Sequence, residues 1–410
     1  MTKKKLTTSM LVPKYVTQFQ CTGGNCPDTC CTGWQVPIDR DSFRDYRRVT
    51  HPALKPLFQT YLVQVDKDSY PLHGRINART SEMRCVMLSD ENLCSIQKAL
   101  GEDALSDTCH VYPRSVVQFG DRVEQSLTLS CPEAARLALT QEDAFEFTVA
   151  EFSTRQATMA VTPAAHGFDF FAMDEVRAFI IQLFQTSALS NVERLAILGW
   201  LCSQLDELAA SGSHHRVHEV LGELTTSIEN GSIQKTVSQL ARQSAVAASV
   251  FSILFGRPLR AGRSDNQQTV LAWVSQGLGL DATTGAVPDT ASLEANYLRG
   301  LGLLQSDGGT AERILTRYLL NDVLRETFPW NQSSALFNYR QLLTRFGIVR
   351  LMLAATAAAL DKPLDEAEMV QVVQVFCRIY QHSDTFAKHS ENVLSGANWD
   401  TLDRLYALLN

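Results

Sequence analysis

Apolar residues recur with a helical period along most of the chain beyond residue 170. Ile314, Tyr318, Leu319 and Val323 stand at i, i+4, i+5 and i+9, which places them on one face of a helix. Runs that alternate apolar and polar residues are scarce in this part, so we expect a helical bundle domain. The segments predicted as helices are 174–186, 191–210, 215–229, 232–255, 267–276, 292–304, 311–326, 335–359, 366–382 and 401–408.

The first 135 residues have a different pattern of apolar and polar residues. Short apolar runs are separated by Gly, Pro, Asp, Ser and Thr, and no long helical period is present. Local signals predict a short helix over 39–48 with Asp39 as its N-cap, and strands within 60–65 and 116–129. A region with so small a core commonly needs a bound metal for stability.

Together these two residue patterns predict a mainly α fold in three parts. A small cysteine-rich, loop-rich domain with few short strands, stapled by a metal or an iron–sulfur cluster, covers 1–135. A linker and connecting helix cover 136–169, because a helix begins at Glu133 and the stretch 161–167 reads as a linker. The helical domain covers 170–410.

Composition and charge narrow the class of protein. With 45% hydrophobic and 20% charged residues over 410 positions, the chain can fill the cores of two or three domains. A formal net charge of -7 argues against a nucleic-acid-binding protein, which carries a basic surplus. The apolar run 10–12 is too short for a signal peptide, and Arg350 interrupts the apolar stretch 348–360. We expect a cytoplasmic protein that does not enter the membrane.

The strongest chemical signal is the clustering of cysteines, eight of the ten lying before residue 132. Cytosolic thiols are kept reduced, so clustered cysteines there are more often metal ligands or catalytic groups than disulfides. Cys202 and Cys377 lie in apolar helical stretches and are predicted to be core residues. The candidate metal ligands are Cys21, Cys26, Cys30 and Cys31, spaced C-x4-C-x3-C-C, followed by Cys85, Cys94, Cys109 and Cys131.

Thiolates suit Zn²⁺ and iron–sulfur clusters, and four of them complete either kind of site. Eight therefore imply two sites, or one site with spare thiols for chemistry or packing. The spacing matches neither a C-x2-C zinc ribbon nor a ferredoxin, so it leaves the metal open, and His110 beside Cys109 is a further candidate ligand. Reduced cysteines packed as small hydrophobes are the alternative.

The cysteines stand in recognisable surroundings. Cys30-Cys31 is followed by Gly33-Trp34, Cys94 by Ser-Ile, and Cys109 by His-Val-Tyr-Pro-Arg. Over 21–114 this resembles a small bacterial family of zinc- or iron-chelating cysteine-cluster proteins. The whole chain, from its opening Val-Pro-Lys-Tyr-Val-x-x-Phe at 12–19 into the helical part, resembles the flagellin lysine-N-methylase family.

The second resemblance implies an enzyme, a protein lysine N-methyltransferase acting on flagellin. It implies S-adenosylmethionine as donor and a [4Fe–4S] cluster, with zinc as the alternative metal. Two other classes of function stay open: a zinc-binding adaptor module without catalytic activity, and an iron–sulfur redox or metal-handling protein.

No nucleotide-binding glycine loop of the Rossmann type is visible. Gly277 and Gly279, and likewise Gly300 and Gly302, follow helical patterns and lack the third glycine, so we expect them at turns and helix ends. If methyl transfer occurs, the cysteine region must then bind the donor or relay the methyl group.

Candidate catalytic residues lie in the first cysteine group. A thiolate that is not a ligand, Cys30 or Cys31, is a candidate to accept and pass on a methyl group. Asp28 is a candidate to take the proton from the lysine ammonium, with a turn-forming role as its structural alternative.

Candidate donor-binding residues lie nearby in the sequence. Arg114 is a candidate partner for the carboxylate of S-adenosylmethionine, and Trp34 or Tyr112 for stacking on its adenine or sulfonium. For each of these three residues a packing role is the alternative.

Overall fold

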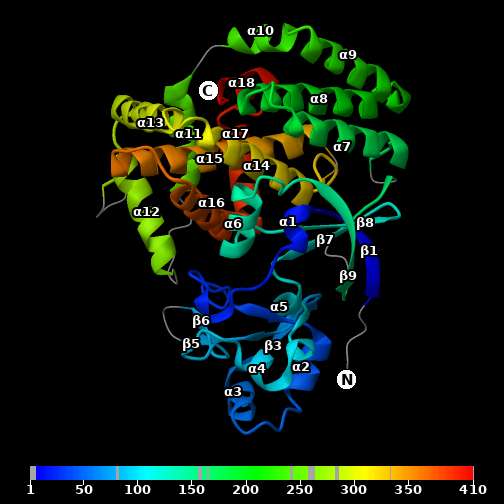
Figure 1. Cartoon of the computed structure of the whole chain (residues 1–410), viewed down its shortest axis with the longest axis vertical. Coiled ribbons are helices and arrows are strands. Elements are labelled where there is room, and N and C mark those ends of the chain that lie inside the picture. The colour runs from blue at the N-terminus through cyan, green and yellow to red at the C-terminus, as the bar shows by residue number, and fades with distance from the viewer. Residues whose placement is uncertain are drawn as a thin grey trace.

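The computed structural model describes residues 6–79, 83–155, 159–163, 166–240, 243–256, 264–281, 286–332 and 334–409. Figure 1 shows a helical part at one end of the molecule, a small lobe coloured blue to cyan at the other, and a sheet beside their junction.

A five-stranded sheet is assembled from segments far apart in the sequence. Its strands are β1 (Leu6–Pro13), β7 (Arg114–Phe119), β8 (Arg122–Leu127), β9 (Phe147–Thr154) and β10 (Met159–Val161). Their order is β10-β7-β8-β1-β9, with β1 antiparallel to β9 along its whole length and parallel to β8. Gly120 has φ +57 in the β7–β8 turn, and the Phe170 ring lies 2.3 Å from where its Cβ would be, so only glycine fits.

The small lobe carries most of the cysteines. Its elements are η1 (Gly23–Asn25), β2 (Val36–Ile38), α2 (Arg40–Tyr46), α3 (Leu54–Tyr61), β3 (Leu62–Ser69), β4 (Leu72–Ile76), β5 (Ala78–Arg79), β6 (Arg84–Cys85), α4 (Ser95–Leu100), η2 (Glu102–Ala104) and α5 (Asp107–Val111). Asp39 caps α2 by accepting from the Ser42 N–H, as predicted. Among the described residues its core holds only thirteen buried apolar side chains, between Val36 and Leu105. So small a core is consistent with a lobe that needs a further cross-link.

The helices fill the rest of the molecule. They are α1 (Lys14–Thr17), α6 (Pro132–Thr140), α7 (Phe170–Gln185), α8 (Asn191–Ser211), η4 (His214–Arg216), α9 (Val217–Glu229), α10 (Ser232–Ser238), α11 (Ser244–Phe255), α12 (Asp265–Leu278), α13 (Thr290–Gln305), α14 (Thr310–Arg325), α15 (Ala335–Leu360), α16 (Glu366–Tyr380), α17 (Asp384–Gly396) and α18 (Leu402–Ala407). One large hydrophobic core joins them to the five-stranded sheet.

Helix α15 is the centre of that core. It contacts α8, α11, α12 and α13. Among the described helices it alone is long and apolar enough to cross a bilayer, but 89% of its apolar window is buried inside the protein. Arg350, which interrupts the apolar run, donates to the Tyr297 hydroxyl at 3.0 Å and to the Leu409 carbonyl at 2.6 Å. The helix is therefore explained as a core element.

Two glycines let neighbouring helices approach α15 closely. A Cβ on Gly277 of α12 would lie 1.8 Å from the Ala355 carbonyl oxygen, and one on Gly300 of α13 would lie 2.0 Å from that of Ala354. The expectation that Gly300 lies at a turn or helix end is wrong, because it lies inside α13 and faces backbone, whereas Gly277 lies in the last turn of α12, as expected. Gly279 ends α12 at φ +74, also as expected.

A buried polar bridge ties the sheet to the helical part. The Tyr15 hydroxyl donates to Asn321 Oδ1 on α14 at 2.5 Å and accepts from the Leu127 N–H at 3.0 Å. Asn321 Nδ2 donates to the Leu127 carbonyl at 3.2 Å. All three polar groups are satisfied inside the core, so this contact fixes the position of β8 on α14.

The structure confirms a mainly helical fold and most of the predicted helices. The segment 232–255 holds two helices, α10 and α11, where one was predicted, and α17 was not predicted. Strands β1, β9 and β10 were also not predicted; the last two lie within 136–169, where a linker was expected. Residues 164 and 165 of the expected 161–167 linker lie outside the described residues. The domain boundaries stay a prediction.

The contact of Gly277 with α15 generates a stability prediction. Gly277→Ala should lower the free energy of unfolding by about 3 kcal/mol, because the new methyl group meets backbone that must move. Gly302→Ala is the matched control, since its Cβ would meet nothing within 4 Å and alanine is the better helix former, by up to about 1 kcal/mol. Denaturant unfolding of both variants checks this, and equal stability of the two would contradict it.

Candidate functional site: a convergence of thiols against helix α16

The eight N-terminal cysteines come from separate elements. Cys21, Cys26, Cys30 and Cys31 lie on the loop 21–31 around η1, and Cys85 ends β6. Cys94 is the N-cap residue of α4, Cys109 lies in α5, and Cys131 is the N-cap residue of α6. All eight are free thiols.

Backbone pairing brings the loop onto β6. The Cys85 N–H donates to the Cys31 carbonyl at 2.8 Å, and the Gly33 N–H donates to the Met83 carbonyl at 3.1 Å. Gly33 has φ +83, a conformation that glycine adopts without strain. This pairing places Cys30 and Cys31 beside cysteines that follow more than fifty positions later in the sequence.

Cys30, Cys85, Cys94 and Cys109 form a complete set. Each lies within electrostatic reach of the other three. Cys31 acts on Cys30, Cys85 and Cys109 as well. The two sequence groups of cysteines therefore lie near one another in the structure, and their convergence on a common metal centre stays a prediction.

A second, smaller set shares Cys30. Cys26, Cys30 and Cys131 act on one another, and Cys21 acts on Cys26. Cys21 is exposed, whereas the other members are partly buried. Eight thiols thus gather in two overlapping sets, which fits either two sites or one site with spare thiols.

Burial controls the pKa of most of these thiols. It raises the pKa of Cys85 to about 11, and that of Cys109 and Cys131 to about 12. Cys30 is the exception, because the Cys31 thiol donates to it and the Arg378 guanidinium lies nearby, which lowers its pKa to about 7. Cys31 has its pKa raised well above the ordinary value by the same pairing with Cys30 and by burial.

The thiols fit a metal centre in donor type, because thiolates suit Zn²⁺ and iron–sulfur clusters. Within the described part of the chain, no three His, Cys, Asp or Glu side chains stand ready around one metal ion. The backbone N–H groups of Ile96 and Gln97 point at Cys94, and those of Glu133 and Ala134 at Cys131, which favours thiolate at both positions. Metal or cluster binding by these cysteines stays a prediction.

Helix α16 closes over the loop, and its polar side chains were not predicted as site residues. Arg378 donates to the carbonyls of Thr29 and Thr32, at 2.9 and 2.8 Å. Gln374 donates to Asp28 Oδ2 at 3.0 Å and to the Ser130 carbonyl at 2.9 Å. The signal that could have revealed them is a pair of polar residues, four positions apart, within the apolar run of 372–380.

Asp28 lies buried at this contact. The residue is 2% exposed, and its Oδ1 has no hydrogen-bond partner among the described residues. Its hydrogen bond with Gln374 gives it a definite structural role, in joining the loop to α16. The unpartnered oxygen beside Cys30 leaves capacity to accept a proton.

Two of the three predicted donor-binding residues lie near Cys30, since Trp34 contacts its carbonyl and Tyr112 lies within electrostatic reach of its thiol. Trp34 Nε1 donates to the Cys30 carbonyl at 2.8 Å, so Trp34 lies at the thiols. The Tyr112 hydroxyl lies 3.2 Å from Ser130 Oγ, and burial raises its pKa. Arg114 begins β7 and lies over the Phe19 ring, 5.8 Å from its centroid.

The predicted alternative ligand His110 lies 3.6 Å from Glu102 Oε1. Cys202 and Cys377 are fully buried, as predicted.

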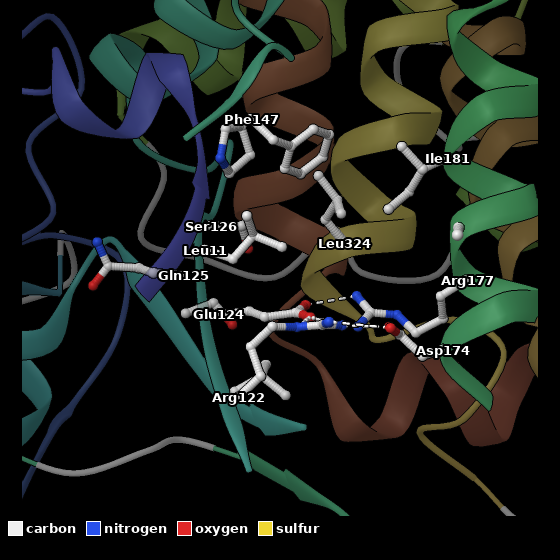
Figure 2. A pocket seen from close by; sticks show the side chains of 14 residues that line it. Leu11, Arg122, Glu124, Gln125, Ser126, Phe147, Asp174, Arg177, Ile181 and Leu324 are labelled. Carbon is white, nitrogen blue, oxygen red and sulfur yellow. Dashed lines mark hydrogen bonds and ion pairs between the residues drawn. The ribbon is translucent and has the colours of Figure 1, made fainter. Parts of the chain in front are cut away.

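A separate cavity lies between the sheet and α7 (Figure 2). Its volume is about 180 Å³, and its charged side chains pair with one another. Arg177 donates to both oxygens of Glu124 at 2.7 Å, while Arg122 bridges Glu124 and Asp174. Arg177 also lies 4.4 Å from the Phe119 ring centroid. These closed pairings identify the charges as a structural link between sheet and helix.

The fold and the thiols together define a class of protein: a mainly helical protein whose N-terminal lobe carries clustered cysteines. Residues 177–408 match the family described as FliB lysine N-methylase C-terminal domain. The chain belongs to the FliB lysine N-methylase family.

Two curated relatives extend the comparison beyond that domain. The chain is 24% identical to the Lysine-N-methylase of Salmonella choleraesuis (strain SC-B67) over 413 residues, covering 97% of this chain and 98% of that protein. It is 33% identical over 132 residues to the Flagellar biosynthetic protein FliU of Salmonella muenchen, covering 32% of this chain and 78% of that protein. No solved structure matches the chain.

The paired charges at the cavity beside α7 generate one prediction. Glu124→Gln should lower the free energy of unfolding by about 3 kcal/mol, because it leaves the Arg177 guanidinium buried without its charge partner. The side chains of Arg177 and Glu124 are 3% and 12% exposed. Glu146→Gln, at an ion pair whose Glu146 side chain is 70% exposed, is the control and should have little effect. Thermal unfolding compares them, and similar shifts for both would refute the assignment.

The lowered pKa of Cys30 generates another prediction for the metal-free protein. Half of Cys30 should be thiolate near pH 7, whereas Cys109, with a pKa of about 12, should stay protonated. Alkylation by iodoacetamide, followed by peptide mass spectrometry, should therefore label Cys30 before Cys109 as pH rises.

The variant Arg378→Met tests whether the Arg378 guanidinium lowers the pKa of Cys30. The Cys30 labelling midpoint should move to higher pH once the guanidinium no longer favours the thiolate. A midpoint that stays the same would show that Arg378 is not responsible.

Proposed function

We propose that this protein transfers methyl groups from S-adenosylmethionine to lysine ε-amines of flagellin, with an iron–sulfur cluster bound by its N-terminal cysteines. The observation that carries the proposal is the gathering of eight thiols around loop 21–31, which hydrogen bonds join to α16, a helix of the lysine N-methylase domain. The alignment with a Lysine-N-methylase over 97% of this chain supports the methylase reading for lobe and helical domain together. The name of the FliU relative supports a flagellar protein as substrate.

Cys30, Cys85, Cys94 and Cys109 are the proposed cluster ligands. Each of them lies within electrostatic reach of the other three, and four thiolates complete a [4Fe–4S] site. Cys31 interacts in the same way with Cys30, Cys85 and Cys109, but Cys94 is preferred because the Ile96 and Gln97 N–H groups favour a thiolate there, whereas the pKa of Cys31 is raised well above its ordinary value. When bound, such a cluster supplies an iron that can take an incoming ligand if one thiolate is released. A reducing cytoplasm, the proposed location, keeps these thiols available.

The remaining residues of the centre have proposed roles around the ligands. Cys31, whose thiol donates to Cys30, is a thiol beside the cluster that is not needed as a ligand. Asp28 is the proposed proton acceptor for the lysine ammonium, because its Oδ1 has no partner and it lies beside Cys30. Its burial means that the amine must enter between loop 21–31 and α16.

The chemistry requires a neutral amine. Once the lysine has lost its proton, the amine lone pair attacks the methyl carbon, the bond from that carbon to the sulfonium sulfur breaks, and S-adenosylhomocysteine leaves. Direct attack is the preferred route, because the sulfonium releases a neutral thioether. A relay through Cys30 or Cys31 would require a thiolate to leave in its second step.

One set of experiments tests cofactor and activity. Protein purified without oxygen should be brown and contain iron and sulfide, and it should transfer label from S-adenosylmethionine to flagellin lysines. Colourless protein with stoichiometric zinc would overturn the cluster and favour the adaptor module. An intact cluster without label on flagellin lysines would overturn the enzyme.

Single Cys→Ser variants should then separate the thiols by role. Variants at Cys30, Cys85, Cys94 and Cys109 should lose iron, whereas Cys31→Ser should retain it and Cys377→Ser, in the helical core, serves as the control. Iron retained in all four ligand variants would contradict the assignment.

A further inference from the structure

A second cavity lies within the lysine N-methylase domain. It has a volume of about 220 Å³ and is enclosed by the end of α14, the residues that follow it, the start of α15 and the junction of α16 with α17. This volume is below the ~300–1,000 Å³ of sites that enclose a drug-sized ligand. It therefore suits one end of a small molecule, with the other end at the opening.

Three polar atoms of the cavity lining lack partners. Arg325 Nε, Asn331 Oδ1 and Gln381 Oε1 are buried, and no described residue hydrogen-bonds to them. Buried polar atoms in folded proteins are nearly always paired. Three residues of this lining thus carry one buried donor and two buried acceptors that a polar ligand would satisfy.

The charges of the lining have a zwitterionic pattern. Arg325 and Arg345 contribute two guanidinium groups, and Glu326, which pairs with Arg325, contributes a carboxylate. Burial alone would raise the pKa of Glu326, but Arg325 and Arg345 hold it below its ordinary value, so the group is ionised at neutral pH. A guanidinium suits an α-carboxylate and Glu326 suits an α-ammonium.

The fully buried carboxylate of Asp322 holds two side chains of the cavity lining in place. It accepts from Arg345 Nε at 2.8 Å and from Gln381 Nε2 at 2.9 Å. Arg345 and Gln381 are thereby fixed, so the cavity is preorganised for a ligand.

Aromatic rings form the remaining wall. Phe328, Tyr380 and Phe386 are buried, whereas Phe337 is only partly buried. Partly exposed rings offer a face on which a purine stacks or a sulfonium cation rests.

The cavity is linked to the turn that carries Cys131 through one residue. His382 follows Gln381, and its Nε2 lies 2.9 Å from the hydroxyl oxygen of Ser130, the neighbour of Cys131. Arg325 and Glu326 lie within electrostatic reach of the same imidazole. The His382 side chain therefore connects the polar end of the cavity to the turn that carries Cys131.

We infer that this cavity binds the amino-acid end of S-adenosylmethionine, with Arg325 at its carboxylate, Glu326 at its ammonium and Phe337 against the nucleoside. The identity of the ligand rests on the proposed function, but the placement does not follow from it. Trp34, Tyr112 and Arg114 are then not the donor-binding residues.

Binding to the cluster-loaded, full-length protein tests the site by isothermal titration calorimetry. Glu326→Gln and Arg325→Met should each weaken binding of S-adenosylmethionine about tenfold or more. Phe337→Ala, at a partly exposed position where folding is least at risk, should weaken S-adenosylmethionine while leaving L-methionine nearly unchanged. Asp174→Asn, which removes an acidic partner at the other cavity, is the control and should bind as the unmodified protein does.

The outcomes separate this inference from the proposed function. If the unmodified protein binds the donor and labels flagellin, and all three variants bind equally well, the placement is overturned and the function stands. If binding depends on the three residues and no label reaches lysine, the function fails and the site stands. Absence of binding by the unmodified protein overturns the site.

Discussion

Hydrogen bonds donated by side chains of α16 hold loop 21–31 in place. The position of the N-terminal cysteines relative to the helical domain depends on this contact. Arg378 and Gln374 donate to main-chain carbonyls of the loop and of the Cys131 turn, in addition to Asp28. These hydrogen bonds fix the position of the loop backbone, and none of them involves a thiol. They are formed by the helical domain, so the geometry of the thiols is set in part by residues outside the lobe that carries them.

The lobe has little else to fix it. Its core is thirteen buried apolar residues among those described, and the thiols pack at its edge. Burial raises the pKa of most of them, which means that the metal-free lobe keeps them as neutral thiols at the protein interior. A bound cation would remove that cost by making thiolates favourable. The same burial that disfavours free thiolates would therefore couple the appearance of thiolate charge to binding of the proposed metal.

Sequence reasoning predicted the helices well, because amphipathic segments such as 311–326 carry their own periodicity. It also predicted the Asp39 cap and the burial of Cys202 and Cys377, which depend on local surroundings. It did not predict β1 or β9, since each finds its partner more than 130 residues away along the chain, and neither has a strong alternating pattern. The convergence of the cysteines was predicted, whereas Gln374, Arg378 and His382 were not, because a polar residue on a helix does not indicate what it will contact. Gly300 was misplaced for a similar reason, because what requires glycine there is the backbone of α15, which no local pattern shows.

The pairing of β1 with β9 makes the cysteine lobe an insertion within the sheet. Residues 36–105 form their own contiguous core, whereas β1 must wait for Phe147–Thr154 to be synthesised before it can pair along its length. During translation the lobe is therefore complete, with seven of its eight thiols, before the sheet can close and long before α16 emerges. Assembly of an inorganic centre on the nascent lobe would meet an open surface, and the helical domain would seal it afterwards.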